Sequence, residues 1–255
     1  MLELYQRLSR LAESDLLHGD LSFVKTWSFL TTDPSSHLEF LVPTGPYAGT
    51  LQAFKTGVDL RTRYADLRAQ ALANNQTNLW TCSSKRDVQT ARYFASGFYD
   101  LDLDPSNLHV IPETGDLGGD TLTPGDTCKN YVDNLDGVGH DLGYGMLAEW
   151  QQTYIPPIVA RLEAQNPGVR FSTLEVYVMQ ELCGFETLAK GGSPWCAVFS
   201  HDEWESFEYA RDLLHFYRSG PGNRYGGAMG WLFLNATTNL MDQGPEEAGP
   251  LFFSL

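Results

Sequence analysis

Long hydrophobic runs are absent from this sequence of 255 residues. No stretch reaches the roughly 18 consecutive apolar residues that indicate a membrane helix, so we expect no membrane span. Basic residues are also scarce: 17 Lys and Arg stand against 32 Asp and Glu, which gives a net charge of −15 at pH 7. Because such a chain repels a phosphate backbone, we expect no nucleic-acid partner. Any site for an anion must be a local cationic pocket.

The sequence also lacks the motifs of common cofactor and metal sites. There is no Walker-type loop and no G-x-G-x-x-G, G-x-S-x-G or H-E-x-x-H pattern. The four cysteines form no C-x-x-C pair, which argues against a zinc site; they are Cys82, Cys128, Cys183 and Cys196. We therefore predict no cofactor and no metal ion.

Apolar residues are nonetheless plentiful, with 42% hydrophobic and 13% aromatic residues. This composition is typical of a globular chain. Short β-prone segments at 79–82, 108–112 and 251–255 read as strands, the last one buried. They are separated by longer stretches of helical spacing, so the sequence predicts a mixed α/β chain.

Several helices are expected from apolar residues at three- and four-residue intervals. We predict an amphipathic helix at the N-terminus and further helices over 51–71, from Tyr144 onward, over 171–187, from Ser200 and over 227–240. Pro156-Pro157 should break or kink the helix that starts near Tyr144. Ser200 and Glu203 form an S-x-x-E capping box. The capping box makes His201 and Asp202 first-turn residues, so we assign them no catalytic role.

The stretch 79–98, LWTCSSKRDVQTARYFASGF, carries the clearest chemical signal. A short strand is followed by Ser83 and Ser84, either of which can cap a helix. Lys85 and Arg86 then fall in the first helical turn, where the helix dipole is positive. Cations suit that place if an anion binds there, because free N–H groups and a guanidinium together form a phosphate site. The alternative is that both are solvated surface charges.

Isolated residues elsewhere carry weaker signals. His109 and His140 stand alone in the sequence, and we interpret both as structural. Two N-glycosylation sequons begin at Asn75 and Asn235. Together with the cysteines they favour a secreted lineage, although the N-terminus has no apolar segment of the kind found in export signals.

Five segments resemble the histidine acid phosphatase family, especially the fungal acid phosphatases and phytases. They are GDLSFVKTW, TGPYAGTLQAFKTGVDLRTRY, SSKRDVQTARYFASGF, HVIPETGDLGGDTLTPGDTC and CGFETLAKGGSPWCAVFSHDEWESFEYARDLLHFYRSGPGN. The resemblance covers nearly the whole chain. It implies a histidine-phosphatase-like α/β fold, in which a mixed sheet core is flanked by helices and a smaller helical cap domain. We expect the core at about 1–112 and 225–255 and the cap at about 113–224.

The resemblance also implies roles for single residues. Arg86 falls on the family's phosphate-binding arginine. A disulfide is implied between Cys183 and Cys196. The expected partner is a small phosphate ester, the expected activity is phosphomonoester hydrolysis, and the expected location is extracellular.

The family's two catalytic motifs do not occur in this sequence. The R-H-G motif with its nucleophilic histidine is missing, and so is the H-D motif that follows a strand similar to LFFSL. We therefore identify no catalytic residue and expect little or no hydrolysis from this chain. Three interpretations remain: a trimmed phosphatase, a diverged protein doing acid–base chemistry such as isomerisation with a carboxyl like Glu113, or a non-catalytic binding protein.

Overall fold

The computed structural model describes residues 1–29, 48–100, 107–117, 120–134, 137–250 and 253–254. The chain forms two compact units, one made of residues 1–38 and 141–220 and the other of residues 39–140 and 221–255. We call them unit 1 and unit 2. These bounds differ from the expected core and cap, and that functional division remains a prediction.

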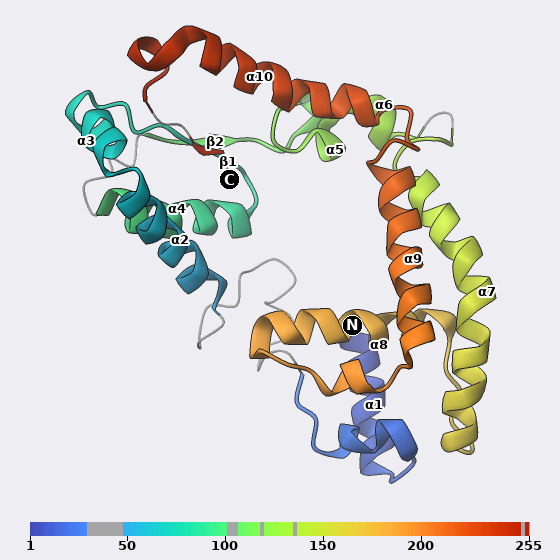
Figure 1. Ribbon diagram of the computed structural model, residues 1–255. Coiled ribbons are helices and arrows are strands. Elements are labelled where there is room, and N and C mark those ends of the chain that lie inside the picture. Colours follow the sequence, from blue (N-terminus) through green and yellow to red (C-terminus); the bar gives the residue numbers. More distant parts are fainter. Residues whose placement is uncertain (30–47, 101–106, 118–119, 135–136, 251–252, 255) are drawn as a thin grey trace. The chain divides into compact units, whose positions relative to one another are not determined.

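Unit 1 is helical in its described part (Figure 1). Its elements are α1 (Leu2–Glu13), the 3-10 helix η1 (Gly19–Lys25), α7 (Asp141–Gln165), α8 (Thr173–Lys190), the 3-10 helix η6 (Pro194–Ala197) and α9 (His201–Arg218). The predicted amphipathic N-terminal helix is confirmed, because Leu4 and Leu8 of α1 are buried. They join one hydrophobic core with side chains of α7, α8 and η6, including Ile155, Leu182 and Trp195.

The prolines of α7 do not end the helix, so of the predicted break or kink at Pro156-Pro157 the break is wrong. Both prolines lie on the exposed side, while their neighbours Ile155 and Ile158 are almost fully buried. A proline removes a backbone hydrogen bond to the carbonyl four residues earlier. Those carbonyls belong to Gln152 and Thr153, which are exposed and therefore open to water. Burial of one face stabilises the helix despite the lost bonds.

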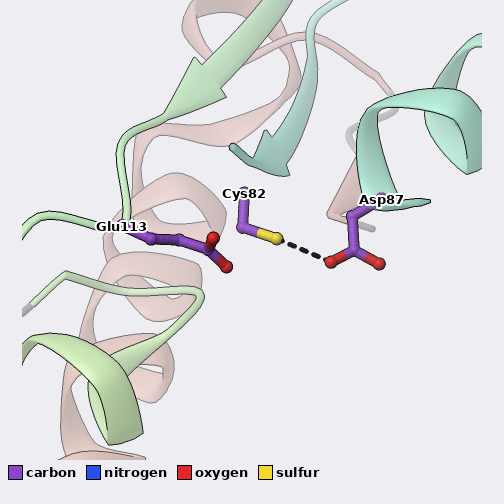
Figure 2. A group of neighbouring side chains, drawn as sticks. All are labelled: Cys82, Asp87 and Glu113. Carbon is purple, nitrogen blue, oxygen red and sulfur yellow. Dashed lines mark hydrogen bonds between the residues drawn. The ribbon is translucent and has the colours of Figure 1, made fainter. Parts of the chain in front are cut away.

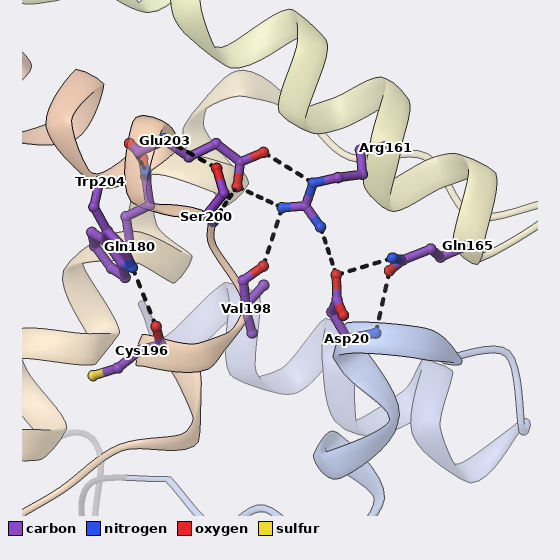
Figure 3. Close-up of polar contacts among 9 residues, drawn as sticks. All are labelled: Asp20, Arg161, Gln165, Gln180, Cys196, Val198, Ser200, Glu203 and Trp204. Carbon is purple, nitrogen blue, oxygen red and sulfur yellow. Dashed lines mark hydrogen bonds and ion pairs between the residues drawn. The ribbon is translucent and has the colours of Figure 1, made fainter.

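A polar cluster around Arg161 joins three elements of unit 1 (Figure 3). Arg161 donates to both carboxylate oxygens of Glu203, at 2.9 and 2.7 Å, and to a carboxylate oxygen of Asp20 at 2.6 Å. Glu203 also completes the capping box with Ser200, as predicted. The start of α9 is thus fixed by its own cap and by α7.

The disulfide implied for Cys183 and Cys196 is present and joins α8 to η6. Thirteen positions separate the two cysteines in sequence. The bond closes the turn between the end of α8 and the buried Trp195. It restricts this connection in the unfolded chain as well as in the folded one.

Unit 2 contains a small parallel sheet with helices packed near it. Its elements are α2 (Gly49–Arg63), α3 (Ala65–Ala73), β1 (Leu79–Cys82), α4 (Lys85–Tyr99), β2 (Leu108–Ile111), η5 (Gly115–Leu117), α5 (Pro124–Thr127), α6 (Lys129–Val132), α10 (Gly226–Glu247) and β3 (Phe253–Ser254). The described strands lie in the order β2-β1-β3, and both pairs are parallel. The predicted strands at 79–82 and 108–112 are confirmed. Of the predicted strand 251–255, only Phe253 and Ser254 are described, and both lie in β3.

Side-chain alternation in β1 separates the two faces of the sheet. Leu79 is fully buried in a cluster with Phe94 and Phe98 of α4. Trp80, one residue on, lines a cavity together with Phe233 of α10. Figure 1 shows α4 on one side of the short sheet and α10 on the other.

Helices α2 and α4 meet at two glycines. A side chain on Gly97 would collide with the backbone carbonyl of Phe54, and one on Gly57 would collide with that of Phe94. The two backbones are therefore in direct contact. This contact brings α2 against the helix that begins at the candidate phosphate site.

Two predicted helices have different bounds in the structure. The segment 51–71 is divided at Tyr64, whose ψ of 36° is not helical, into α2 and α3. The last helix continues past the predicted end at Leu240 to Glu247, with a non-helical Gly244 inside it. Pro245 follows Gly244, a position where proline can start a new helical turn. Among the described residues, no helix combines the length and apolarity needed to cross a bilayer.

Candidate active site

Arg86 lies in the first turn of α4, just beyond the carboxyl end of β1. Ser84 is the N-cap, and its hydroxyl accepts a hydrogen bond from the backbone N–H of Asp87. The side chain of Arg86 is 52% exposed. Ligands of parallel α/β sheets bind beyond the carboxyl ends of the strands. The local fold thus puts Arg86 where the sequence predicted an anion site.

A cavity of about 520 Å³ opens beside Arg86. We call it the phosphate cavity. Three segments of unit 2 line it: the β1–α4 connection, residues 121–124 and the first turns of α10. Its lining residues are Cys82, Arg86, Asp87, Thr121, Leu122, Thr123, Pro124, Met229, Gly230 and Phe233.

The guanidinium of Arg86 is partly engaged by Asp87. Its Nε lies 3.3 Å from Oδ1 and its Nη2 lies 3.4 Å from Oδ2 of that carboxylate. Neither contact uses Nη1. A guanidinium carries five N–H donors, so Arg86 can still donate to an anion while Asp87 holds the other side. Asp87 also orients the guanidinium.

The thiol of Cys82 lies between two carboxylates, which sequence reasoning did not bring together (Figure 2). Its Sγ donates to Oδ2 of Asp87 at 2.8 Å, and Glu113 lies on its other side. Burial first, and then the hydrogen bond to Asp87, raise the pKa of the Cys82 thiol to about 11. The thiol therefore keeps its proton across the neutral and acidic range. The S-x-x-D spacing of Ser84 and Asp87 was a sequence signal for part of this cluster.

Asp87 is correspondingly held as a carboxylate. Burial raises its pKa, but hydrogen bonds from Cys82, Ser84 and Arg86 outweigh burial and leave the pKa below the ordinary 3.8. Asp87 thus stays ionised in mild acid.

The same three side chains could hold a metal ion. One ligand atom each from Cys82, Asp87 and Glu113 lie within 4.8 Å of one another. A thiolate with two carboxylates would suit a divalent cation such as zinc. The same thiol donates a hydrogen bond to Asp87, so a metal ion would have to replace that proton.

Several other residues singled out from the sequence are not among those that line the phosphate cavity. His109 stacks on Trp80, and its ring nitrogen is 2.8 Å from Asn78. His201 is 85% exposed and pairs with Glu205 on the same helix. These contacts agree with structural roles. Cys82 and Cys128 are free thiols, while Asn75 and Asn235 are exposed.

Comparison with known proteins identifies the family to which the chain belongs. The model of the histidine phosphatase superfamily, branch 2, matches residues 7–254. The chain belongs to this family. In this family member, Arg86 lies at the carboxyl edge of the parallel sheet.

Curated proteins similar to this chain include fungal phytases and acid phosphatases. A phytase of Candida albicans is 29% identical over 229 residues, which cover 88% of this chain and 47% of that protein. An acid phosphatase of Komagataella pastoris is 29% identical over 254 residues, 98% of this chain and 52% of that protein. The chain thus spans about half the length of these curated relatives.

A solved structure supports the same fold assignment. The crystal structure of the phytase from D. castellii matches with a TM-score of 0.81 and 29% identity. The match covers 99% of this chain and 54% of that one. The predicted α/β histidine-phosphatase-like fold is confirmed.

Proposed function

We propose that this chain binds phosphate monoesters through Arg86, as part of an acid phosphatase of the histidine phosphatase family. The observation that carries the proposal is the position of Arg86 in a member of this family. Arg86 lies in the first turn of a helix, at the carboxyl edge of a parallel sheet, and it lines a cavity. Nη1 donates to a phosphoryl oxygen, and the helix dipole adds a favourable term. Asp87 fixes the guanidinium and stays ionised at acidic pH.

Hydrolysis by the 255 residues themselves is expected to be weak. A phosphohistidine mechanism needs a histidine nucleophile and an acid for the leaving alcohol. The sequence holds no R-H-G motif, and among the described residues that line the phosphate cavity there is no histidine. Toward hydrolysis, this chain can contribute only phosphate binding and electrostatic stabilisation. The described residues give no support to isomerisation, for which Glu113 was the suggested carboxyl.

The test is isothermal titration of inorganic phosphate into the chain at pH 5, beside Arg86→Ala. Loss of a charged hydrogen bond of about 1.5–3 kcal/mol should weaken phosphate binding tenfold or more. Arg92→Ala is the matched control, because Arg92 is exposed on the same helix and does not line the cavity. Equal phosphate affinity in the wild type and Arg86→Ala would overturn the proposal.

Secretion and N-glycosylation belong to the same proposal. The Cys183–Cys196 disulfide suits an oxidising compartment, and both sequon asparagines are exposed. Expression through a eukaryotic secretory pathway should give a chain whose mass falls on endoglycosidase treatment. Asn75→Gln and Asn235→Gln should each remove one glycan. An unchanged mass in the wild type would contradict the glycosylation proposal.

A further inference from the structure

The phosphate cavity adjoins a second cavity in unit 2. This second cavity has a volume of about 340 Å³, and we call it the apolar pocket. Its lining residues are Trp80, Ile111, Thr121, Leu122, Phe233, Ala236, Thr237 and Leu240. Three of them, Thr121, Leu122 and Phe233, also line the phosphate cavity. A ligand in the phosphate cavity can therefore contact residues that also line the apolar pocket.

The lining of the apolar pocket suits a hydrocarbon surface. None of its described lining residues is charged, and its polar groups are two threonine hydroxyls and the indole of Trp80. Trp80 comes from the sheet face turned toward α10, whereas Phe233 and Leu240 come from α10 itself. Ligand pockets of this kind are mainly apolar with a few polar groups. A polyol in this pocket would lose hydration at more hydroxyls than these three groups can pair with.

The charges around the phosphate cavity favour one phosphate group over several. Arg86 is the one basic residue among its described lining residues, and Asp87 already shares that charge. Glu113 lies beside Cys82 and adds a second carboxylate to the neighbourhood. A further phosphate on the same ligand would meet these carboxylates without a cation of its own.

We infer that the site takes phosphate monoesters whose alcohol part is apolar, an aryl or alkyl group that fills the apolar pocket. The inference rests on the proposed function, because the phosphate must be held by Arg86. The phosphoryl group lies at the first turn of α4, and the ester oxygen points past Thr121 and Phe233. The alcohol part then packs between Trp80 and Leu240.

The experiment compares three ligands by titration at pH 5: inorganic phosphate, glycerol 1-phosphate and 1-naphthyl phosphate. Burial of an aromatic ring contributes about 25 cal/mol per Å² of apolar area, so naphthyl phosphate should bind at least tenfold more tightly than glycerol phosphate. Leu240→Asn should remove most of this preference and leave the affinity for inorganic phosphate unchanged. Leu234→Asn is the matched control, since Leu234 is 56% exposed on the same helix and does not line the pocket.

The outcomes separate this inference from the proposed function. Phosphate binding that depends on Arg86, with equal affinity for the two esters, overturns the inference alone. Naphthyl phosphate binding that survives Arg86→Ala unchanged also overturns it, because the two cavities then do not act on one ligand. Absence of phosphate binding by the chain overturns both.

Discussion

Cys82 has a buried thiol and two carboxylate neighbours, a combination that decides its reactivity. Only the thiolate form reacts with alkylating agents. A pKa of about 11 in place of 9.0 lowers the thiolate fraction at pH 8 roughly a hundredfold, because each pH unit is a factor of ten. Cys82 is therefore expected to react slowly with alkylating agents, although it lies at a candidate active site.

Iodoacetamide at pH 8 should modify Cys128, which is half-buried, well before Cys82. Timed quenching and peptide mass spectrometry would give the two rates. Asp87→Asn should accelerate the reaction at Cys82, because the Asp87 carboxylate helps to keep the thiol protonated. In denaturant the two rates should converge. Equal rates in the folded chain would contradict the protonated thiol.

Asp87 makes the free energy of unfolding of unit 2 depend on pH in the acidic range. Its pKa is lower in the folded chain than the ordinary value of 3.8, so its contribution is present above that value and is lost as the pH falls through the folded pKa. Between pH 5 and pH 2, Asp87→Asn should lose less unfolding free energy than the wild type. Asp126→Asn, at an exposed position of α5, should lose as much as the wild type. Chemical unfolding at each pH gives these values.

At the scale of elements, the α2–α4 contact depends on two residues without side chains. Gly97→Ala would put a methyl group against the carbonyl of Phe54 and should reduce the free energy of unfolding by about 3 kcal/mol or more, since overpacking costs about 1–3 kcal/mol even where side chains can shift. The measurement is urea unfolding followed by circular dichroism.

Gly184→Ala provides the matched control for this substitution. Gly184 lies inside α8, and beyond its chain neighbours and the adjacent helix backbone no atom lies within 4 Å of an added methyl group. Alanine there should raise helix stability by about 0.5–1 kcal/mol. If both variants lost the same stability, the backbone contact would not explain the loss at Gly97, because Gly184 has no such contact.

Elements governed by local chemistry could be predicted from the sequence. The strand at 79–82, the helix capped by Ser84 and the capping box at Ser200 follow from residues that are neighbours in the chain. The continuous α7 could not be predicted, because its stability across Pro156-Pro157 comes from burial of Ile155 and Ile158. Tertiary packing here outweighs a local rule.

The candidate site shows the same division. The position of Arg86 in the first turn of a helix could be predicted from the sequence, whereas its phosphate-binding role stays a prediction. Glu113 beside Cys82, and the meeting of Trp80 with Phe233, could not. These pairs come from segments far apart in sequence, and sequence spacing carries no information about such distances.

At the scale of the whole molecule, the net charge of −15 at pH 7 is the dominant electrostatic property. Repulsion among excess carboxylates destabilises compact states and is screened by salt. Raising NaCl from 10 to 200 mM at pH 7 should increase the melting temperature by about 2–4 °C, the shift that ~1 kcal/mol produces in a chain of this size. Near the pI of about 4.6 the increase should vanish. Calorimetry that shows equal increases at both pH values would contradict a net-charge effect.

The parallel pairing of β1 with β3 has a consequence for how the protein is made. Leu79 pairs with Phe253, and the residues of unit 1 from 141 to 220 lie between them in the chain. The ribosome therefore synthesises all of unit 1 before it synthesises β3. During synthesis, the edge of β1 that pairs with β3 therefore stays unpaired until unit 1 has been completed. Chaperones that shield exposed strand edges would have their longest opportunity to act on this protein during that interval.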